Sequence, residues 1–339
     1  MFEDKVVLIT GGSGSLGRAL TSRLLKEDVK NIRIFSRNEI KQIEMKDEFE
    51  DESRLRFLIG DVRDRDRLSK AMEGVDIVFH TAALKHVPIV EYNPFEAIKT
   101  NVIGTQNVID ASHKENVEIA VGIGTDKAVS PVNIYGATKL LTEKLFVSAK
   151  NYVDTKKYKT KFLAIRYGNV LGSSGSVLPK FAQQILDNKQ ISITHPEMTR
   201  FTITMQDALD FILNSIKNSN GSETFVPKLS AYNIMDLKDA LFSILGDCEY
   251  KISKIRPGER MNEILLNKLE MTYSINNENQ FVLFPPELFP IEPELKYPNF
   301  KTIDEPYEYS SDMAQKLTVD QIKALIQNSG ILDTIKDRI

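Results

Sequence analysis

An apolar strand that runs directly into a glycine-rich turn is the feature that most restricts the fold. Residues 5–10 read KVVLIT, the turn reads GGSGSLG, and the helix that follows places Leu16, Leu20 and Leu24 on one face. A strand without alternation of apolar and polar residues is typical of a parallel sheet covered on both faces. Glycines between such a strand and a helix N-terminus let the backbone approach a pyrophosphate. We therefore expect the N-terminal part to bind a dinucleotide.

The glycines fit a dinucleotide-binding pattern in two registers. Gly12, Gly14 and Gly17 fit G-x-G-x-x-G, whereas Gly11, Gly14 and Gly17 fit the variant T-G-x-x-G-x-x-G with Thr10 at its head. A tight turn without a ligand accounts less well for so many small residues. The turn residues predicted to contact the cofactor are Thr10, Gly11, Ser13, Gly14, Ser15, Leu16 and Gly17.

The residues after the second apolar run, NIRIF, indicate which dinucleotide binds. A protein that selects NAD usually has an acidic residue about 20 residues after the glycines, where it binds the ribose hydroxyls. This chain has Ser36, Arg37 and, one helical turn later, Lys41. A hydroxyl and a guanidinium suit the 2′-phosphate of NADP better than a bare ribose. Lys41 alone could equally be a solvated surface cation, but together the three predict a preference for NADP.

The third and fourth apolar runs, LRFLI and DIVFH, bring further groups to the same sheet edge. Asp61 and Val62 follow the third run and are expected to meet the adenine. Ala82 and Ala83 follow the fourth run and are small enough for the chain to pass close to the dinucleotide, and Lys85 is expected to face the cleft. The alternation of strands and helices predicts an α/β fold with a Rossmann-type doubly wound parallel sheet.

The alternation stops near residue 170, and this divides the chain. Residues 1–170 are predicted to form the NADP-binding domain, completed by parts of 191–226. Residues 171–339 are predicted to form mainly a smaller, discontinuous C-terminal domain for the substrate. A length of 339 residues is consistent with two domains.

The composition argues against several functional classes. A net charge of −3 and a pI near 6.0 give no electrostatic reason to expect nucleic acid or a membrane surface as partner. No apolar stretch approaches the roughly 20 residues of a membrane span, and the N-terminus leaves no room for a signal peptide. The single cysteine, Cys248, excludes an intrachain disulfide and suits a reducing compartment. We expect a cytoplasmic protein without a metal site.

The segment TDKAVSPVNIYGATK, residues 125–139, carries the candidate catalytic residues. It follows the apolar run IAVGI, and open α/β sheets place ligands at the carboxyl ends of their strands. Thr125, Asp126 and Lys127 are expected at that end. Asn101, on a long helix after the fourth strand, is expected to bridge to the catalytic strand, because buried amides are usually hydrogen-bonded.

Tyr135 and Lys139 follow in a helical segment, four residues apart and therefore on one face. The free pKa of tyrosine is about 10, so a phenol needs a neighbouring cation to act as a base near neutral pH. Lys139 is expected to lower the pKa of Tyr135 in this way. An isolated Y-x-x-x-K is more often a surface pair, but the neighbouring Thr, Asp and Lys favour chemistry here.

Several segments together carry a likeness to a known family: TGGSGSLG, FSRNEIKQ, AALKHVP, TDKAVSPVNIYGATK, RYGNV, MTRFTIT and IRPGERMNE. The chain resembles an extended short-chain dehydrogenase/reductase acting on a nucleotide sugar, and more narrowly the inverting UDP-N-acetylglucosamine 4,6-dehydratases of the pseudaminic acid pathway. The likeness runs from about residue 4 to the tail. Asp126-Lys127 is its most specific element, because retaining hexose 4,6-dehydratases usually have Asp-Glu there and 4-epimerases lack the pair.

The resemblance implies a carbon–oxygen lyase that uses NADP, acts on UDP-N-acetylglucosamine and forms a homo-oligomer of two or more subunits. Tyr135 would take the 4-hydroxyl proton during oxidation, while Lys139 holds the nicotinamide ribose and Thr125 binds the new ketone. Lys127, if neutral, would remove the 5-proton, and Asp126, if protonated, would donate to the departing 6-hydroxyl. The product would be UDP-2-acetamido-2,6-dideoxy-β-L-arabino-hex-4-ulose. Burial is therefore expected to shift both pKa values towards neutrality and to prevent a simple salt bridge between the two side chains.

The resemblance also assigns residues to the nucleotide sugar. They are Lys85, His86, Asn169, Ser176, Val177, Arg200, Arg256 and Glu259. Two positions depart from the family pattern. Relatives often have Ser where this chain has Gly124, so this chain is expected to have one hydroxyl fewer near the nicotinamide. They often have Arg where this chain has Ser174, so its electrostatic attraction for the substrate is expected to be weaker.

Other functions stay open at this point. A UDP-sugar 4-epimerase or a retaining 4,6-dehydratase would use the same scaffold, and Asp126-Lys127 taken alone could be a structural ion pair at a strand end. A non-catalytic NADP-binding sensor would be expected to have lost the Tyr–Lys pair or its acid–base neighbours, all of which are present.

Overall fold

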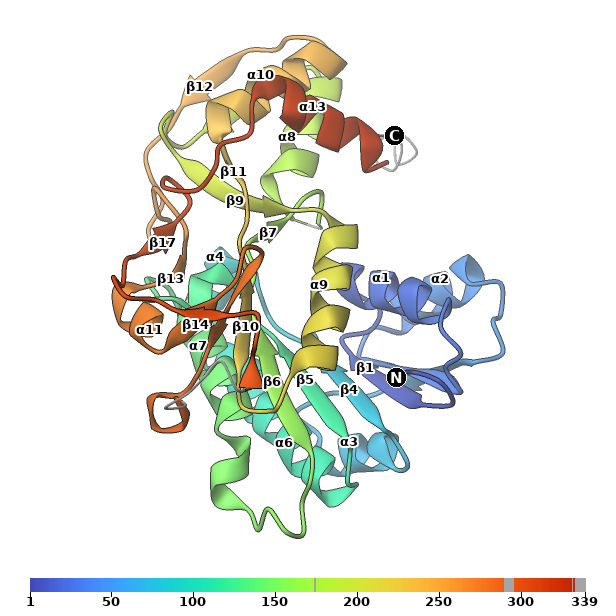
Figure 1. Ribbon diagram of the computed structural model, residues 1–339. Coiled ribbons are helices and arrows are strands. Elements are labelled where there is room, and N and C mark those ends of the chain that lie inside the picture. Colours follow the sequence, from blue (N-terminus) through green and yellow to red (C-terminus); the bar gives the residue numbers. More distant parts are fainter. Residues whose placement is uncertain (174, 290–295, 331, 333–339) are drawn as a thin grey trace.

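A large sheet dominates the computed structural model, which describes residues 1–173, 175–289, 296–330 and 332. Its parallel strands are β1 (Val6–Thr10), β2 (Asn31–Ser36), β3 (Leu55–Ile59), β4 (Ile77–His80), β5 (Ile119–Ile123), β6 (Lys161–Ile165) and β10 (Thr224–Pro227). They stand in the order β3-β2-β1-β4-β5-β6-β10 (Figure 1). The order reverses between β1 and β4, which is the switch point of a doubly wound fold. The predicted fold class is confirmed.

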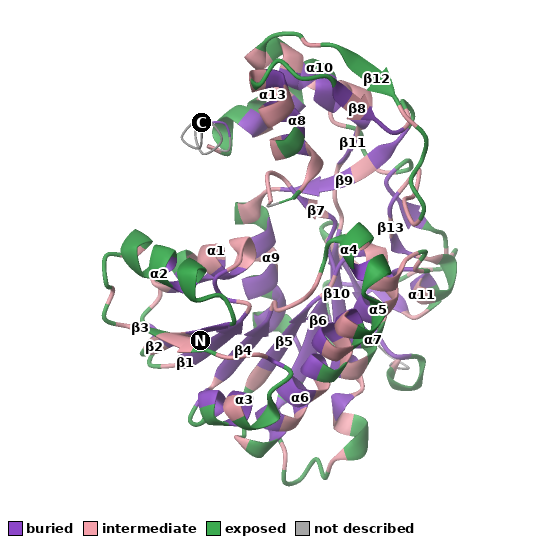
Figure 2. Ribbon diagram, turned by 180° about the vertical axis from the view of Figure 1, so that it is seen from behind, coloured by how far each residue is buried: buried purple, intermediate pink, exposed green. Residues whose placement is uncertain are grey.

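Helices cover both faces of the parallel sheet, since its strands are apolar on both sides. They are α1 (Ser15–Leu24), α2 (Glu39–Glu48), α3 (Arg65–Met72), α6 (Gly104–Lys114), α7 (Ile134–Val147) and α9 (Met205–Asn218). Val7 and Ile9 of β1 belong to a core that includes residues of α1, α2 and α9. Val6 and Leu8 belong to a second core, with α3, α6 and α7. Figure 2 shows the strands buried and the outer surfaces of several helices exposed.

The sheet continues past β10 with antiparallel strands. β15 (Gln280–Leu283) pairs with β10, β14 (Ser274–Asn276) pairs with β15, and β16 (Lys301–Thr302) pairs with β14. The many prolines and aromatic residues of 284–306 predict an extended covering chain; β16 lies within this segment, and residues 290–295 are outside the described part. The C-terminal half therefore contributes to the large sheet, and the division near residue 170 stays a prediction.

A smaller region lies beyond the carboxyl ends of the parallel strands (Figure 1). Its strands are β7 (Asn169–Val170), β8 (Ile191–Ile193), β9 (Thr199–Ile203), β11 (Ala231–Asn233) and β12 (Tyr250–Ile252), and β13 (Ile264–Leu266) pairs nearby with β17 (Tyr309–Ser310). The helices α8 (Val177–Leu186), α10 (Ile234–Leu245) and α13 (Val319–Asn328) pack around a third core. Thr318 caps α13 by accepting from the backbone N–H of Gln321.

The long helix expected after β4 is divided into short pieces. They are α4 (Val87–Tyr92), α5 (Pro94–Ala97) and the π-helical η1 (Ile98–Ile103), which leads into α6. Pro94 has no backbone N–H and therefore begins a new helix. In the described residues, no helix is both long and apolar enough to cross a membrane.

Candidate active site

The catalytic stretch begins at the carboxyl end of β5, as predicted. Thr125 precedes a short 3₁₀ turn, η2 (Asp126–Ala128), and its side chain caps that turn at the backbone N–H of Lys127. The backbone N–H of Asp126 donates to the carbonyl of Tyr167 at 3.1 Å, which fixes the turn beside the end of β6. This arrangement brings Thr125, Asp126 and Lys127 to the sheet edge where ligands bind in such folds.

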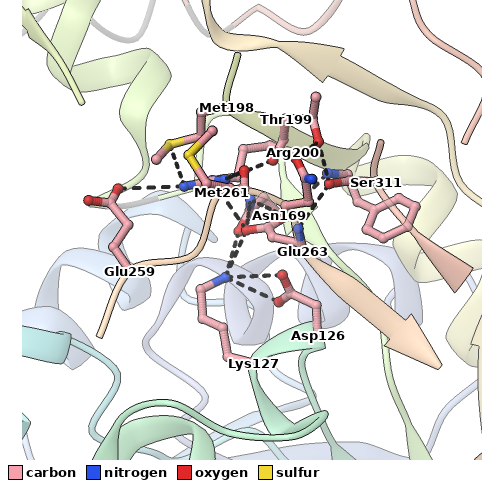
Figure 3. A network of polar contacts seen from close by, with 12 residues as sticks. Asp126, Lys127, Asn169, Met198, Thr199, Arg200, Glu259, Met261, Glu263 and Ser311 are labelled. Atoms are coloured by element: carbon pink, nitrogen blue, oxygen red, sulfur yellow. Dashed lines mark hydrogen bonds and ion pairs between the residues drawn. The ribbon is translucent and has the colours of Figure 1, made fainter. Parts of the chain in front are cut away.

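Lys127 is held by three polar side chains (Figure 3). Its Nζ lies 3.1 Å from Asp126 Oδ1, 3.1 Å from Asn169 Oδ1 and 3.2 Å from Glu263 Oε1. An ammonium has three N–H donors, and each has a partner here. The Asp126 side chain is almost fully buried, whereas a third of the Lys127 side chain is exposed. Lys127 also lines the cavity described below.

The ionisation expected for Asp126 and Lys127 is wrong for this state of the protein. Burial alone would raise the pKa of Asp126, but the Lys127 ammonium and the Thr125 hydroxyl lower it below its usual value. Burial alone would lower the pKa of Lys127, but Asp126 and Glu263 raise it above its usual value. The two side chains form a salt bridge, although burial was expected to prevent one. Attraction between the charges outweighs desolvation because two carboxylates surround one ammonium.

Glu263 is the residue of this network that the sequence analysis missed. It is buried at 6% exposure and accepts from Asn169 Nδ2 at 2.8 Å and from the backbone N–H of Phe201 at 3.1 Å. Burial, and then the charge of Asp126, raises the pKa of its carboxyl group. Its segment, IRPGERMNE, carried part of the family resemblance. The signal that could have identified Glu263 in the sequence was its position as an acidic residue directly before a strand on the substrate side.

Tyr135 lies in the first turn of α7, which begins where Asn133 accepts from the backbone N–H of Gly136 at 2.7 Å. The Thr125 hydroxyl is one of the groups that act to lower the pKa of the Tyr135 phenol. Burial raises the pKa of the phenol, and the cation that opposes this shift is Lys127. The structure thus joins Tyr135 to Thr125, Asp126 and Lys127.

The Lys139 side chain is bound to the end of β5, and its expected effect on the pKa of Tyr135 stays a prediction. Its Nζ donates to the carbonyl of Ile123 at the end of β5. Although the two residues are one helical turn apart, the lysine side chain is turned towards the strand. Burial lowers the pKa of Lys139 to about 8. Lys139 therefore sits in the site, but its charge is not among those that act on the phenol in this structure.

Asn101 supports the site at a different place from the one expected. Its Nδ2 donates to the carbonyl of Leu84 at 2.9 Å and to Thr138 Oγ1 at 3.0 Å, and its Oδ1 accepts from the backbone N–H of Leu84 at 2.8 Å. It joins the loop after β4 to helix α7, and not to the catalytic strand. The π-helical turn places the amide here, and such turns are frequent at functional sites.

The glycine turn is shaped for a close ligand. Gly11 has a φ of +67°, and a Cβ there would lie 2.8 Å from backbone atoms of Ala82. A Cβ on Gly17 would lie 2.3 Å from the carbonyl oxygen of Gly12. Only glycine fits these positions, and the turn leads to the N-terminus of α1, the end of a helix that attracts anions. This geometry fits the pyrophosphate of a dinucleotide.

The prediction that Thr10 contacts the cofactor is wrong. It is fully buried, and its hydroxyl hydrogen-bonds with His80 Nδ1 at 2.8 Å. The Nε2 of His80 hydrogen-bonds with Thr105 Oγ1 at 3.0 Å, and burial lowers the pKa of this histidine to about 3. Thr10 therefore supports the turn from below and offers no surface to a ligand. Val62 is also buried, while Asp61, Ala82 and Ala83 are partly exposed.

Ser36, Arg37 and Lys41 lie together beside the glycine turn. Ser36 Oγ accepts from Ser13 Oγ at 2.9 Å and from Gln42 Nε2 at 2.9 Å. Arg37 and Lys41 are exposed, and Arg37 lies 3.5 Å from Asp61. The structure thus brings a hydroxyl and two cations to the end of β2.

A cavity of about 400 Å³ lies between the catalytic strand end and the smaller region. All eight residues predicted to bind the nucleotide sugar line it: Lys85, His86, Asn169, Ser176, Val177, Arg200, Arg256 and Glu259. Asp126, Lys127 and Glu263 line it as well. The Oγ of Ser176 and the Nη1 of Arg260, also at this cavity, are buried without a hydrogen-bond partner among the described residues.

The two departures from the family pattern have different outcomes. A side chain at Gly124 would meet the carbonyl oxygen of Ile165 at 2.7 Å and Glu143 Oε2 at 3.2 Å. A residue with a Cβ there would therefore require the neighbouring backbone to shift, and the expected loss of a hydroxyl near the nicotinamide stays a prediction. Ser174 lies outside the described residues.

Comparisons with known proteins show the family to which the chain belongs. A family model described as polysaccharide biosynthesis protein matches residues 7–285. The UDP-N-acetylglucosamine 4,6-dehydratase (inverting) of Campylobacter jejuni subsp. jejuni serotype O:2 is 46% identical over 287 residues, which cover 84% of this chain and 84% of that protein. The UDP-glucose 4-epimerase of Rickettsia bellii is 39% identical over 351 residues, which cover 100% and 99%.

A solved structure is similar over nearly the whole chain. The X-ray structure of Pen from Bacillus thuringiensis has a TM-score of 0.88 at 37% identity, and the match covers 96% of this chain and 99% of that one. The family resemblance inferred from the sequence is confirmed. The chain belongs to the family of polysaccharide biosynthesis proteins.

Proposed function

We propose that this protein is an NADP-dependent UDP-N-acetylglucosamine 4,6-dehydratase that inverts position 5. The observation that carries the proposal is that Asp126 and Lys127 line a cavity of about 400 Å³, while Tyr135, in the first turn of α7, is near enough for its pKa to depend on both of them. A phenol, an amine and a carboxyl group are the groups needed to oxidise a sugar and then remove water from it. The dehydratase of Campylobacter jejuni, 46% identical, supports the same assignment.

Each catalytic residue of this chain has its own role in the proposed reaction. Tyr135 takes the proton of the 4-hydroxyl, and Thr125 binds the same oxygen. The glycine turn would hold NADP, which would supply the chemistry of hydride transfer between positions 4 and 6. Lys127 takes the 5-proton, which the new ketone has made acidic, and Asp126 donates a proton to the departing 6-hydroxyl. Lys127 then returns its proton to position 5 from the opposite face.

We assign the dinucleotide to the glycine turn and the loops after β2, β3 and β4. Gly11, Gly14 and Gly17 leave room for the pyrophosphate at the N-terminus of α1. Ser36, Arg37 and Lys41 are assigned to the 2′-phosphate, since no acidic side chain occupies the end of β2. The remaining assignments are Ser13, Ser15, Leu16, Asp61, Val62, Ala82, Ala83, Lys85, Tyr135 and Lys139.

We assign the UDP part to the far side of the cavity. Ser176 precedes α8, and its hydroxyl, which has no hydrogen-bond partner in the described part of the chain, and the helix N-terminus suit a phosphate. Arg200 and Arg256 offer guanidinium groups, although Arg200 now donates to the carbonyls of Thr199 and Met261 and would have to share them. Glu259 is assigned to the ribose.

A 4-epimerase is the second candidate, because the Rickettsia bellii epimerase matches the whole chain at 39% identity. The test is to incubate the purified protein with UDP-N-acetylglucosamine, without added cofactor, and to record proton NMR spectra of the products. A new methyl doublet, with coupling constants of an inverted position 5, supports the dehydratase. Epimerised sugar that keeps its 6-hydroxyl would overturn the proposal in favour of the second candidate.

We further propose that the protein self-associates through the face formed by α4, α5, η1 and α7, which pack against one another. Large apolar side chains are exposed on this face: Ile89, Tyr92, Phe95, Ile98, Ile103 and Leu141. An exposed patch of this kind usually marks an interaction site. Light scattering of the purified protein measures its mass in solution, and a monomer at micromolar concentration would contradict this part of the proposal.

A further inference from the structure

We propose that Asn133 is a positioning residue, which ties the loop of residues 256–260 to the helix that carries Tyr135. The proposal rests on the proposed dehydratase function, in which this loop binds the UDP part and Tyr135 takes the 4-hydroxyl proton. Asn133 sets the distance between the nucleotide and the base, and so places position 4 of the hexose beside the phenol.

Asn133 makes two hydrogen bonds with one side chain, and each leads to a different part of the site. Its Oδ1 accepts from the backbone N–H of Gly136 at 2.7 Å and so caps α7, two residues before Tyr135. Its Nδ2 donates to the carbonyl of Gly258 at 2.8 Å. A side-chain amide can form both bonds at once, because its oxygen accepts while its nitrogen donates. The start of the catalytic helix and the loop 256–260 therefore share one side chain.

The contact between the two segments is close. Gly258 has a φ of +77°, and a Cβ there would lie 3.0 Å from Cβ of Asn133. A residue larger than glycine would therefore be strained and would press the loop away from the helix. Beside this contact, Nη2 of Arg260 donates to the carbonyl of Ser130. Asn133, Gly258 and Arg260 all line the cavity, so the tie lies where the substrate is assigned.

The loop is also attached to the smaller region, independently of Asn133. The carbonyl of Met261, the residue after the loop, accepts from the backbone N–H of Thr199 at 3.1 Å and from Nη1 of Arg200 at 3.0 Å. Both donors belong to β9. Loss of the Asn133 bond therefore leaves the loop in place on β9 and removes one of its ties to the catalytic helix.

This division predicts an effect on the rate of the reaction and not on nucleotide affinity. The groups assigned to UDP stay on the loop and on β9, so UDP should still bind. The hexose, however, would no longer be held at a fixed distance from Tyr135. A displacement of about 1 Å between reacting groups can lower a rate by as much as about 100-fold. Because Arg260 keeps a second tie, through Ser130, the expected loss is smaller than this.

The test uses two variants that keep the helix cap and remove the bond to Gly258. Aspartate and serine are N-caps as good as asparagine, but a carboxylate has no donor and a serine hydroxyl is too short to reach the carbonyl. For Asn133→Asp and Asn133→Ser we expect kcat for the 6-deoxy product to fall about tenfold, while the dissociation constant of UDP changes by less than about threefold. Titration calorimetry with UDP also counts the binding sites. Expressing kcat per site ensures that partly unfolded protein does not imitate the effect.

The control is Asn233→Asp, because Asn233 caps α10 in the same way, by accepting from the backbone N–H of Met235 at 2.7 Å. It is not one of the described residues that line the cavity, and its substitution should change neither constant.

Four results would overturn the proposal. They are an unchanged kcat in both Asn133 variants, weaker UDP binding with an unchanged kcat, a loss in the aspartate variant alone, which would be an effect of its charge, and variants without UDP-binding sites, which would show that Asn133 is needed for folding. Failure of the proposed function is distinguishable, because wild-type enzyme would then release no 6-deoxy sugar.

Discussion

The Lys127 ammonium lies 3.2 Å from Oε1 of Glu263, a residue 136 positions further along the chain. Lys127 follows a strand of the large sheet, whereas Glu263 directly precedes β13. The backbone N–H of Glu263 donates to Ser311 Oγ at 2.9 Å, and the backbone N–H of Ser311 donates back to the Glu263 carbonyl at 2.8 Å. The C-terminal segment therefore supplies a fixed carboxyl group to the catalytic network.

Glu263→Gln should slow turnover without weakening substrate binding. The substitution keeps the shape of the side chain but weakens the contact that fixes the Lys127 Nζ beside the cavity. The accompanying fall in the pKa of Lys127 favours its neutral form, so the expected loss comes from the poorer position of the base. We expect kcat to fall by about 10- to 100-fold while KM changes by less than about threefold. Steady-state kinetics with UDP-N-acetylglucosamine measure both constants.

Glu223→Gln is the matched control for this variant. Glu223 is also buried, at 2% exposure, but its carboxyl group accepts from the backbone N–H groups of Asn220 and Gly221, far from the cavity. Its kcat should stay near that of wild type. Equal loss of kcat in both variants would mean that Glu263 acts only through stability.

The fold was predictable from the sequence because its signals are local. KVVLIT before GGSGSLG and the apolar runs that follow determine the order and direction of the parallel strands. The antiparallel edge was missed, although Ser274–Asn276 and Gln280–Leu283 flank a short polar turn typical of a hairpin. These strands are short, and they lie in a part of the chain without regular alternation.

The sequence predicted which residues form the site, but it did not predict their ionisation states. The eight substrate residues meet at one cavity, but the salt bridge of Lys127 depends on Glu263, which no local pattern connects to it. The orientation of Lys139 was also unpredictable, since helical spacing gives the face of a residue and not the direction of a long side chain.

Arg37→Ala should change the choice between cofactors. If the guanidinium binds the 2′-phosphate, its loss should weaken NADP binding about tenfold and NAD binding by less than about twofold. Titration calorimetry with each dinucleotide measures the two dissociation constants. Arg56→Ala, on the exposed edge strand β3, is the control. Tighter binding of NAD than of NADP by wild type would contradict the assignment.

Arg166 is expected to be important for stability. Its guanidinium is fully buried and binds Glu143 of α7, Glu270, and the carbonyl of Leu265 at 2.8 Å. Arg166→Met leaves two buried carboxylates without their partner, which should cost about 3–5 kcal/mol of unfolding free energy. Denaturant unfolding measures the loss.

The control is Arg54→Met. Arg54 pairs with Glu52 at 3.0 Å near the surface, where such pairs contribute at most about 1 kcal/mol. A similar small loss for both variants would show that the buried cluster of Arg166 is unimportant for stability.

Lys139 should make stability depend on pH in the alkaline range. Burial lowers its pKa from 10.5 to about 8 in the folded protein. The folded state therefore disfavours the charged lysine, and this penalty is fully present below pH 8. This penalty disappears as the pH rises towards 10.5, and its loss should increase the free energy of unfolding by roughly 3 kcal/mol.

Unfolding of cofactor-free wild type and Lys139→Met at several pH values tests this sign. The stability of wild type relative to the variant should increase from pH 8 upwards. A difference that is constant with pH would show that Lys139 has an ordinary pKa.

The central claim is that Lys127 removes the 5-proton after Tyr135 has allowed oxidation at position 4. Lys127→Ala tests it most directly, in one rapid-mixing experiment with UDP-N-acetylglucosamine. We predict that absorbance of the reduced nicotinamide appears, because oxidation remains possible, and that no 6-deoxy sugar is released. Release of 6-deoxy product at the wild-type rate would contradict the account.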